Sequence, residues 1–150
     1  MGDKISSRIH RINLLNAEVS ALYHQASLKV GLTDSASIVL YTLCDNGGEC
    51  PLSEICKQSG VSKQTVNSAL RGLEKSGLIR LEQASGRTKQ ARLTDAGQAY
   101  ARKTVARLFD AEAAAFSTWT EAEISAHIGF LEKYIRLFRE QVEKMDCSGE

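Results

Sequence analysis

The fold of this chain is decided by the stretch Val61-Ser-Lys-Gln-Thr-Val-Asn-Ser-Ala-Leu-Arg-Gly-Leu-Glu-Lys-Ser-Gly-Leu-Ile79. Its apolar residues follow the i, i+3, i+4, i+7 spacing of an amphipathic helix, at Val66, Ala69, Leu70 and Leu73. A shorter helical pattern at residues 52–59 precedes this helix and is closed by Gly60, while Ser62 can cap the second helix. Two short helices across a tight glycine-containing turn predict a helix-turn-helix.

The opposite face of the second helix is polar and carries only one acid, Glu74. Its predicted DNA-binding side chains are Ser62, Lys63, Gln64, Thr65, Asn67, Ser68 and Arg71. Lysine and arginine suit guanine edges, asparagine and glutamine suit adenine, and serine suits either bases or phosphates. An ordinary solvated helix face has a similar composition, so this stripe alone leaves both interpretations open.

A short hairpin is predicted after this helix, with strands at residues 78–82 and 87–93 around a turn at 83–86. Thr94-Asp95 then begins another helix. Residues 61–93 hold seven Lys or Arg against two Glu, although the whole chain has a net charge of only +1. A local basic patch of this kind favours nucleic-acid contact, with Arg87 and Lys89 in the hairpin as further DNA-binding residues.

A helix-turn-helix followed by a basic hairpin is a winged helix, and the chain resembles the MarR (multiple-antibiotic-resistance regulator) family. The segments that carry the resemblance are, in order, Leu32-Thr33, Leu52-Ser53-Glu54-Ile55, Thr65-Val66, Leu73-Glu74-Lys75-Ser76-Gly77-Leu78-Ile79, Arg87 and Leu93-Thr94-Asp95-Ala96-Gly97. The family usually has an aspartate two residues before the wing arginine, where this chain has Ser85. That departure puts the rigidity of the wing in doubt.

The resemblance implies a mainly α (α+β) fold, a winged helix-turn-helix with a two-stranded β-wing and long N- and C-terminal dimerisation helices. It also implies a homodimeric transcriptional regulator, usually a repressor, that binds a palindromic operator. Four cysteines in a sequence without a secretory signal are typical of reduced thiols, so a cytoplasmic protein is expected. The helix at 62–75 would enter the major groove and Arg87 the adjacent minor groove. A small-molecule effector would enter between the lobes, where Tyr23, His24, Tyr41 and Tyr100 are candidate ligand-binding residues, although each is equally explained as core filling.

The remaining helices are expected at residues 5–30, 34–45, 95–115 and from Thr120 onward, with a minor strand at 49–51 that the resemblance implies. The last helix has apolar residues in alternating steps of four and three, at Ile124, Ile128, Leu131, Ile135, Phe138, Val142 and Met145. This heptad pattern predicts a helix-packing seam. The terminal stripes either pack on each other within one monomer or form the interface of a dimer.

We therefore expect one structural unit over residues 1–150 with two functional parts. A winged-helix DNA-binding lobe would span residues 32–93, and a helical dimerisation lobe would combine residues 1–31 and 94–150. The sequence has no run long and apolar enough to span a membrane.

Other chemistry has little support in the sequence. The cysteines at 44, 50, 56 and 147 lack zinc spacing, and neither a metal nor a cofactor is expected. Cys50 lies in a polar stretch and is predicted to be the exposed, most reactive thiol, whereas Cys44 and Cys56 fall on apolar helical faces. No P-loop, dinucleotide or nucleophile-elbow motif is present, so the chain is not expected to be an enzyme.

Two other classes of function also use a winged helix. A winged helix used only for protein–protein interaction would keep the apolar core but would not need a basic wing. An enzyme with an appended winged helix would need residues outside the two lobes for its active site. The basic surplus of residues 61–93 weighs against the first class, and the length of the chain weighs against the second.

Overall fold

A computed structural model of the protein describes residues 2–86 and 88–145. Within these ranges the elements follow the order α1 (Gly2–Lys29), α2 (Asp34–Asp45), β1 (Glu49–Pro51), α3 (Leu52–Ser59), α4 (Lys63–Lys75), β2 (Ile79–Gln83), β3 (Lys89–Leu93), α5 (Asp95–Lys103), α6 (Val105–Phe116) and α7 (Glu121–Glu143). The chain divides into two compact units, Met1–Phe109 and Asp110–Glu150. In the two described ranges, no helix is long and apolar enough to cross a membrane.

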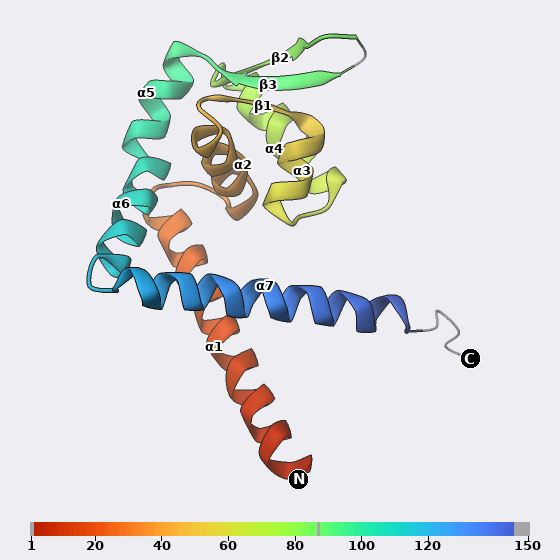
Figure 1. Ribbon diagram of the computed structural model, residues 1–150. Coiled ribbons are helices and arrows are strands. Elements are labelled where there is room, and N and C mark those ends of the chain that lie inside the picture. Colours follow the sequence, from red (N-terminus) through yellow and green to blue (C-terminus); the bar gives the residue numbers. More distant parts are fainter. Residues whose placement is uncertain (1, 87, 146–150) are drawn as a thin grey trace. The chain divides into compact units, whose positions relative to one another are not determined.

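The first unit contains a winged helix, which confirms the predicted fold class. Its three strands form an antiparallel sheet in the order β1-β3-β2. The register pairs Ile79 with Leu93 and Gln83 with Lys89, so β2 and β3 form a hairpin that projects beyond helices α2 to α4 (Figure 1). The hairpin is the predicted wing, although each strand begins one or two residues later than the sequence pattern indicated.

The helix-turn-helix is formed by α3 and α4 and follows the sequence prediction closely. Gly60 ends α3 with a φ of 67°, a left-handed conformation that glycine adopts without steric cost. Ser62 caps α4, because its Oγ accepts a hydrogen bond from the backbone N–H of Thr65 at 3.2 Å. The buried face of α4 consists of Val66, Leu70 and Leu73.

These side chains pack into one hydrophobic core beneath the sheet. The largest fully buried members come from α2, α3, α4, β2 and α6, namely Val39, Leu40, Leu43, Ile55, Val66, Leu70, Ile79 and Val105. Burial of each such side chain contributes about 1.5–3 kcal/mol. The core therefore fixes the position of α4 from its apolar side and leaves its polar side free for contacts with a ligand.

The predicted single helix over residues 95–115 is wrong, because the helix breaks at Thr104. This residue has φ −121° and ψ −91°, and it separates α5 from α6. Its Oγ1 donates a hydrogen bond to the carbonyl oxygen of Tyr100 at 2.8 Å. A threonine hydroxyl that bonds the carbonyl four residues earlier offers the backbone an alternative to the helical ladder and often bends a helix.

The prediction of an exposed Cys50 is also wrong. Cys50 is the middle residue of β1 and is only 1% exposed, while its neighbour Glu49 points to solvent. Burial raises the pKa of the Cys50 thiol, and the charge of Glu54 raises this pKa further. Three residues are too few to show an alternating strand pattern in the sequence, so the inward direction of Cys50 became visible only through its pairing with Ala91 on β3.

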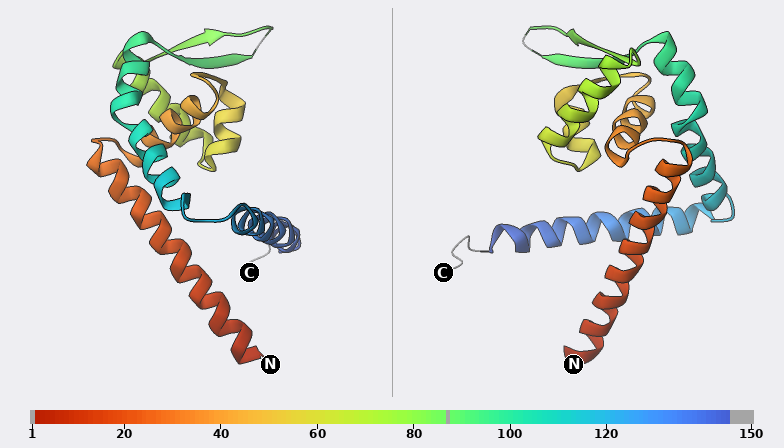
Figure 2. Two further views of the ribbon diagram at one scale, coloured as in Figure 1. Left: turned by 60° about the vertical axis from the view of Figure 1, so that its left-hand side comes forward. Right: turned by 180° about the vertical axis from the view of Figure 1, so that it is seen from behind.

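The terminal helices agree with the predicted helical segments, except that α1 begins three residues earlier than expected. A capping box starts α7: Thr120 Oγ1 accepts from the backbone N–H of Glu123 at 3.2 Å, and the Glu123 carboxylate accepts from that of Thr120 at 2.8 Å. The bonds from Thr120 also hold the pKa of the Glu123 carboxyl below its usual range. Figure 2 shows α1 and α7 each as one unbroken helix.

Both terminal helices leave large apolar side chains exposed. On α1 they are Ile5, Ile9, Ile12, Leu14, Leu15, Val19, Leu22, Tyr23 and Leu28. On α7 and the residues just after it they are Ile128, Phe130, Leu131, Tyr134, Ile135, Leu137, Phe138, Val142 and Met145. Ile135, at 52% exposure, and Phe138, at 53%, are typical of these sets, which we call the α1 apolar face and the α7 apolar face.

Hydrogen bonds join the end of α4 to the foot of the wing, by which we mean residues 93–94, where β3 ends and α5 begins. Thr94 Oγ1 donates to the carbonyl oxygen of Gly77 at 2.7 Å, and the Thr94 backbone N–H donates to that of Leu78 at 3.0 Å. The same Thr94 Oγ1 accepts from the N–H of Gly97 at 3.0 Å and so caps α5. A Cβ on Gly97 would lie 1.8 Å from the Leu78 carbonyl oxygen, so only glycine permits this approach.

We predict that Gly97→Ala destabilises the protein by about 1–3 kcal/mol or more, because the new methyl group forces the junction apart. The matched control is Gly72→Ala in α4, where a Cβ would meet no heavy atom within 4 Å. Since alanine favours a helix over glycine, the control should be neutral or stabilise by roughly 0.5–1 kcal/mol. Urea unfolding of the three proteins measures both changes, and equal stability of Gly97→Ala and wild type would refute the close packing at the junction.

The order of thiol reactivity is expected to be the reverse of the sequence prediction. Cys44 and Cys56 are partly exposed, whereas Cys50 reacts only when the strand opens. In the native protein a disulfide reagent should label Cys50 at least about tenfold more slowly than Cys56. Peptide mapping after timed labelling measures the rates, and the difference should disappear in denaturant. A faster reaction at Cys50 in the native protein would contradict its burial.

Candidate nucleic-acid interface and an adjoining pocket

The exposed face of α4 carries the side chains that the sequence singled out for DNA contact. Lys63, Gln64, Thr65, Ser68 and Arg71 are exposed, and Asn67 is half-buried. They lie opposite the buried Val66, Leu70 and Leu73, so the core orients the whole set outward together. The structure therefore brings these predicted residues onto one surface, and their role in DNA binding remains a prediction.

The first turn of α4 uses two of these residues for its own structure. Ser62 Oγ caps the helix and also lies 2.8 Å from Thr65 Oγ1. The backbone N–H groups at this end carry the partial positive charge of the helix terminus, and the first turn contains no acidic residue. An anionic group such as a phosphate would be favoured there together with Lys63.

Two hydrogen bonds at the tip of the wing were not predictable from the sequence. The Gln83 side-chain amide donates to the carbonyl oxygen of Gly86 at 2.7 Å, and the Ala84 N–H donates to that of Thr88 at 2.7 Å. These bonds hold the described part of the turn, although Ser85 stands where an acid was expected. Lys89 is exposed on β3, whereas Arg87 lies outside the described residues.

One basic residue of the wing is already neutralised within the protein. Arg92 of β3 forms ion pairs with Glu49 of β1 at 2.6 Å and with Glu82 of β2 at 3.4 Å, so it links all three strands. Both pairs are about half exposed, and their contribution to stability is small. Arg92 is therefore a bracing residue, and the basic surplus available to DNA is smaller than the sequence count implied.

The four candidate ligand-binding residues lie in different surroundings within the chain. His24 on α1 bonds Asp34 at the start of α2, with Nδ1 and Oδ2 2.8 Å apart. Tyr41 stacks on Phe109 with ring centroids 4.0 Å apart, and Tyr100 lines a pocket between the start of α2 and α4. Tyr23 is exposed on α1. A single ligand pocket formed by all four remains a prediction that requires a partner surface.

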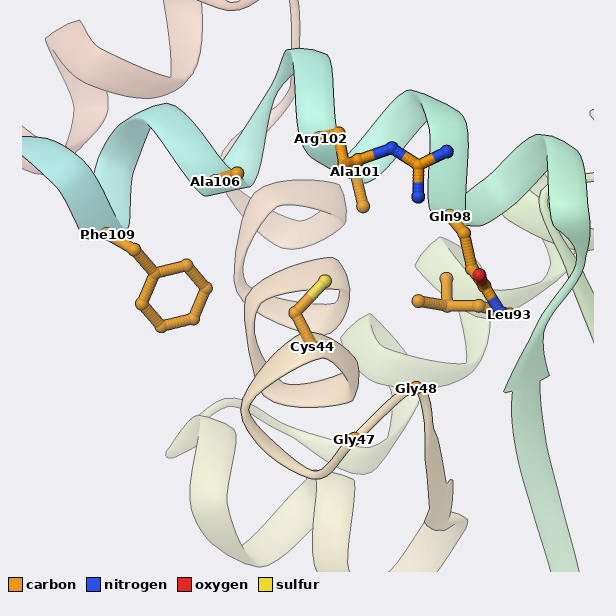
Figure 3. A pocket seen from close by; sticks show the side chains of 9 residues that line it. All are labelled: Cys44, Gly47, Gly48, Leu93, Gln98, Ala101, Arg102, Ala106 and Phe109. Atoms are coloured by element: carbon orange, nitrogen blue, oxygen red, sulfur yellow. The ribbon is translucent and has the colours of Figure 1, made fainter.

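A different pocket, which the sequence analysis missed, lies where α2 ends and α5 meets α6 (Figure 3). It has a volume of about 280 Å³ and is lined by Cys44, Leu93, Gln98, Arg102 and Phe109, among others. Gln98 and Arg102 are four residues apart on α5 and so share a helix face. The sequence shows this spacing, but no local pattern in it predicts that Gln98 and Arg102 lie near Cys44 or Leu93.

Metal binding has no geometric support in the described ranges. Among their histidine, cysteine, aspartate and glutamate side chains, no group of three or more is placed to hold an ion.

The geometry of the first unit defines a winged-helix fold, and comparisons with known proteins show which proteins share it. Residues 30–90 match the model of the MarR family. A MarR family regulator from Neisseria meningitidis superposes with a TM-score of 0.71 at 21% identity, covering 95% of this chain and 96% of that one. A comparison with curated protein sequences finds no match.

Two further solved structures combine this fold with a named small molecule. NadR, solved in complex with 4-hydroxyphenylacetate, has a TM-score of 0.67 at 17% identity over 81% of this chain and 89% of its own. BpsR of Bordetella bronchiseptica, whose DNA binding is regulated by 6-hydroxynicotinic acid, has a TM-score of 0.63 at 21% identity over 82% and 97%. Residues 30–90 are thus similar to the MarR family, and the chain shares the winged-helix fold of these solved structures.

Proposed function

We propose that the protein is a homodimeric transcriptional regulator, most simply a repressor, which binds a palindromic DNA operator. The observation that carries the proposal is the exposed polar face of α4, held outward by a fully buried apolar face. In a helix-turn-helix the second helix lies in the major groove and contacts base edges. Lys63, Gln64 and Arg71 supply the side chains that such contacts require.

The two apolar faces support the dimeric part of the proposal. Apolar side chains with exposures near 50% recur along α1 and along α7, and contiguous exposed surfaces of this kind mark interaction sites. A two-fold dimer would present two α4 helices to half-sites about 34–36 Å apart, which corresponds to one turn of DNA. A palindrome read by two helices specifies more base pairs than one helix can contact.

The proposed regulator also responds to a small organic effector. This part rests on the two similar structures whose described molecules, 4-hydroxyphenylacetate and 6-hydroxynicotinic acid, are both aromatic acids. The function proposed here needs neither a cofactor nor an active site. A winged helix that binds only proteins is the alternative, and its basic side chains on α4 would then have no DNA partner.

The first experiment selects bound sequences from a random DNA pool and then measures affinity against salt concentration. Gln64→Ala or Asn67→Ala should cost about 1–3 kcal/mol and relax the preference at particular base pairs, with the salt dependence little changed. Arg87→Ala should weaken binding to operator and to unrelated DNA alike, and should remove roughly one counterion per site from the salt slope.

The matched control for the helix variants is Gln141→Ala on α7, which should leave DNA binding unchanged. Selection of no consensus sequence, together with equal affinity of wild type and Gln64→Ala, would refute sequence-specific binding through α4. A change in base preference for Arg87→Ala without a change in salt slope would reverse the roles assigned to the wing and the helix.

The second experiment tests the dimer by sedimentation. Wild type should be dimeric at micromolar concentration, whereas Ile135→Glu should shift the protein toward monomer, because a buried unpaired charge costs several kcal/mol. The control is Lys133→Glu, which lies off the heptad seam of α7 and should remain dimeric. A wild-type monomer would contradict the proposed assembly and would favour packing of the terminal stripes within one chain.

A further inference from the structure

Glu74 stands where both the helix and the proposed DNA surface disfavour an acid. It is exposed in the last turn of α4, where the negative end of the helix dipole opposes a carboxylate. It is also the only acidic residue of α4, whose exposed face we propose contacts DNA. Since a residue that breaks two local rules is expected to have a compensating role, its contacts are informative.

The compensating contact is a hydrogen bond to the wing. The backbone N–H of Leu81 on β2 donates to Glu74 Oε1, and the nitrogen and oxygen are 3.3 Å apart. The sheet has the order β1-β3-β2, so β2 is an edge strand whose outer N–H groups have no neighbouring strand to bond. Glu74 therefore supplies an acceptor that a further strand would otherwise provide.

Glu74 makes this bond instead of an ion pair on its own helix. Arg71 lies three residues earlier, a spacing that brings side chains together on a helix surface. Within residues 2–86 and 88–145, however, neither Glu74 nor Arg71 takes part in an ion pair. The carboxylate is used by the wing, and the Arg71 guanidinium remains available for an external anion such as a DNA phosphate.

The bond lies where the wing leaves the core. Ile79 is 1% exposed, and Leu81 is the last apolar side chain of β2 that packs against the core. Beyond Leu81 the hairpin projects past the helices (Figure 1). Thr94 holds the hairpin at Gly77 and Leu78, and the Glu74 bond adds a second attachment further along the strand. A strand held only at its foot can swing about that point, whereas two attachments fix its angle to α4.

We propose that Glu74 is a positioning residue whose carboxylate fixes the angle between the wing and α4, so that both elements reach DNA at a set separation. This inference rests on the proposed function and deepens it. The exposed bond contributes little to stability, because water competes for both of its groups. Its effect is on binding, since a released wing has to be ordered when DNA binds, and that ordering lowers the affinity.

The bond itself is tested without DNA, by amide hydrogen exchange of the full chain measured by NMR. Glu74→Ala should speed the exchange of the Leu81 amide severalfold, because the acceptor is gone. Glu74→Gln is the matched control, since it removes the same charge but keeps an oxygen that accepts, and its Leu81 amide should exchange like wild type. The Ala84 amide, which bonds Thr88 within the hairpin, should exchange alike in all three proteins.

The positioning role is tested by combining each variant with Arg87→Ala and measuring binding to a selected operator. In wild type and in Glu74→Gln, Arg87→Ala should weaken binding by the same factor. In Glu74→Ala this factor should shrink by at least about twofold, because a released wing contributes less to binding. Partial unfolding would lower every affinity without changing the factor, and urea unfolding of Glu74→Ala should match that of wild type.

Selection from a random DNA pool should separate the two parts of recognition. Glu74→Ala should keep the preferences at base pairs that α4 contacts. It should lose preference in the flanking sequence, where a narrow minor groove attracts arginine. Glu74→Gln should keep both preferences, which a purely electrostatic effect of the carboxylate would not allow.

The outcomes distinguish this proposal from the proposed function. Equal Leu81 exchange in Glu74→Ala and wild type, or equally fast exchange in Glu74→Gln and Glu74→Ala, would overturn the bond. An unchanged Arg87→Ala factor in Glu74→Ala would overturn the positioning role and leave DNA binding standing. Failure of wild type to bind any selected DNA would overturn the proposed function and with it the role of Glu74 at DNA, while hydrogen exchange would still decide whether Glu74 holds the wing to α4.

Discussion

The structure depends on the close approach of two backbone segments at the foot of the wing. Thr94 bonds the carbonyl oxygens of Gly77 and Leu78, and Gly97 lies so near Leu78 that a side chain has no room. Four elements meet at this point, because α4 ends there, β2 begins there and β3 passes into α5. The junction therefore sets the position of the wing relative to α4, and it connects both to α5.

The chemistry of the exposed α4 surface, which we propose contacts DNA, follows from how the core divides the residues of α4. Val66, Leu70 and Leu73 are held in the core, so the polar residues between them all face outward. In the wing, the basic side chains differ in whether they are paired. Arg92 forms ion pairs with Glu49 and Glu82, whereas Lys89 is exposed. A count of basic residues overstates the charge that DNA would meet, because a basic residue paired with acids contributes little to the field.

The break at Thr104 brings α5 and α6 to one pocket beside the end of α2. A continuous helix would carry Arg102 and Phe109 on one straight rod. The bend instead lets α5 and α6 each contribute walls to one pocket beside the end of α2. The apolar faces of α1 and α7 serve a separate purpose in the proposed assembly. They are too exposed for core residues and too regular for an ordinary surface.

The sequence by itself determined the features that depend on neighbouring residues. Three such features are predictable because they depend on residues only a few positions apart. They are the spacing of the helix-turn-helix, the heptad of α7 and the helix caps at Ser62, Thr94 and Thr120. Tertiary structure alone decided the burial of Cys50, the neutralisation of Arg92 and the pocket that joins Arg102 to Cys44. Each of these joins residues that are ten or more positions apart and lie on different elements. The local pattern of a sequence does not specify which distant strand or helix will pack beside a given residue.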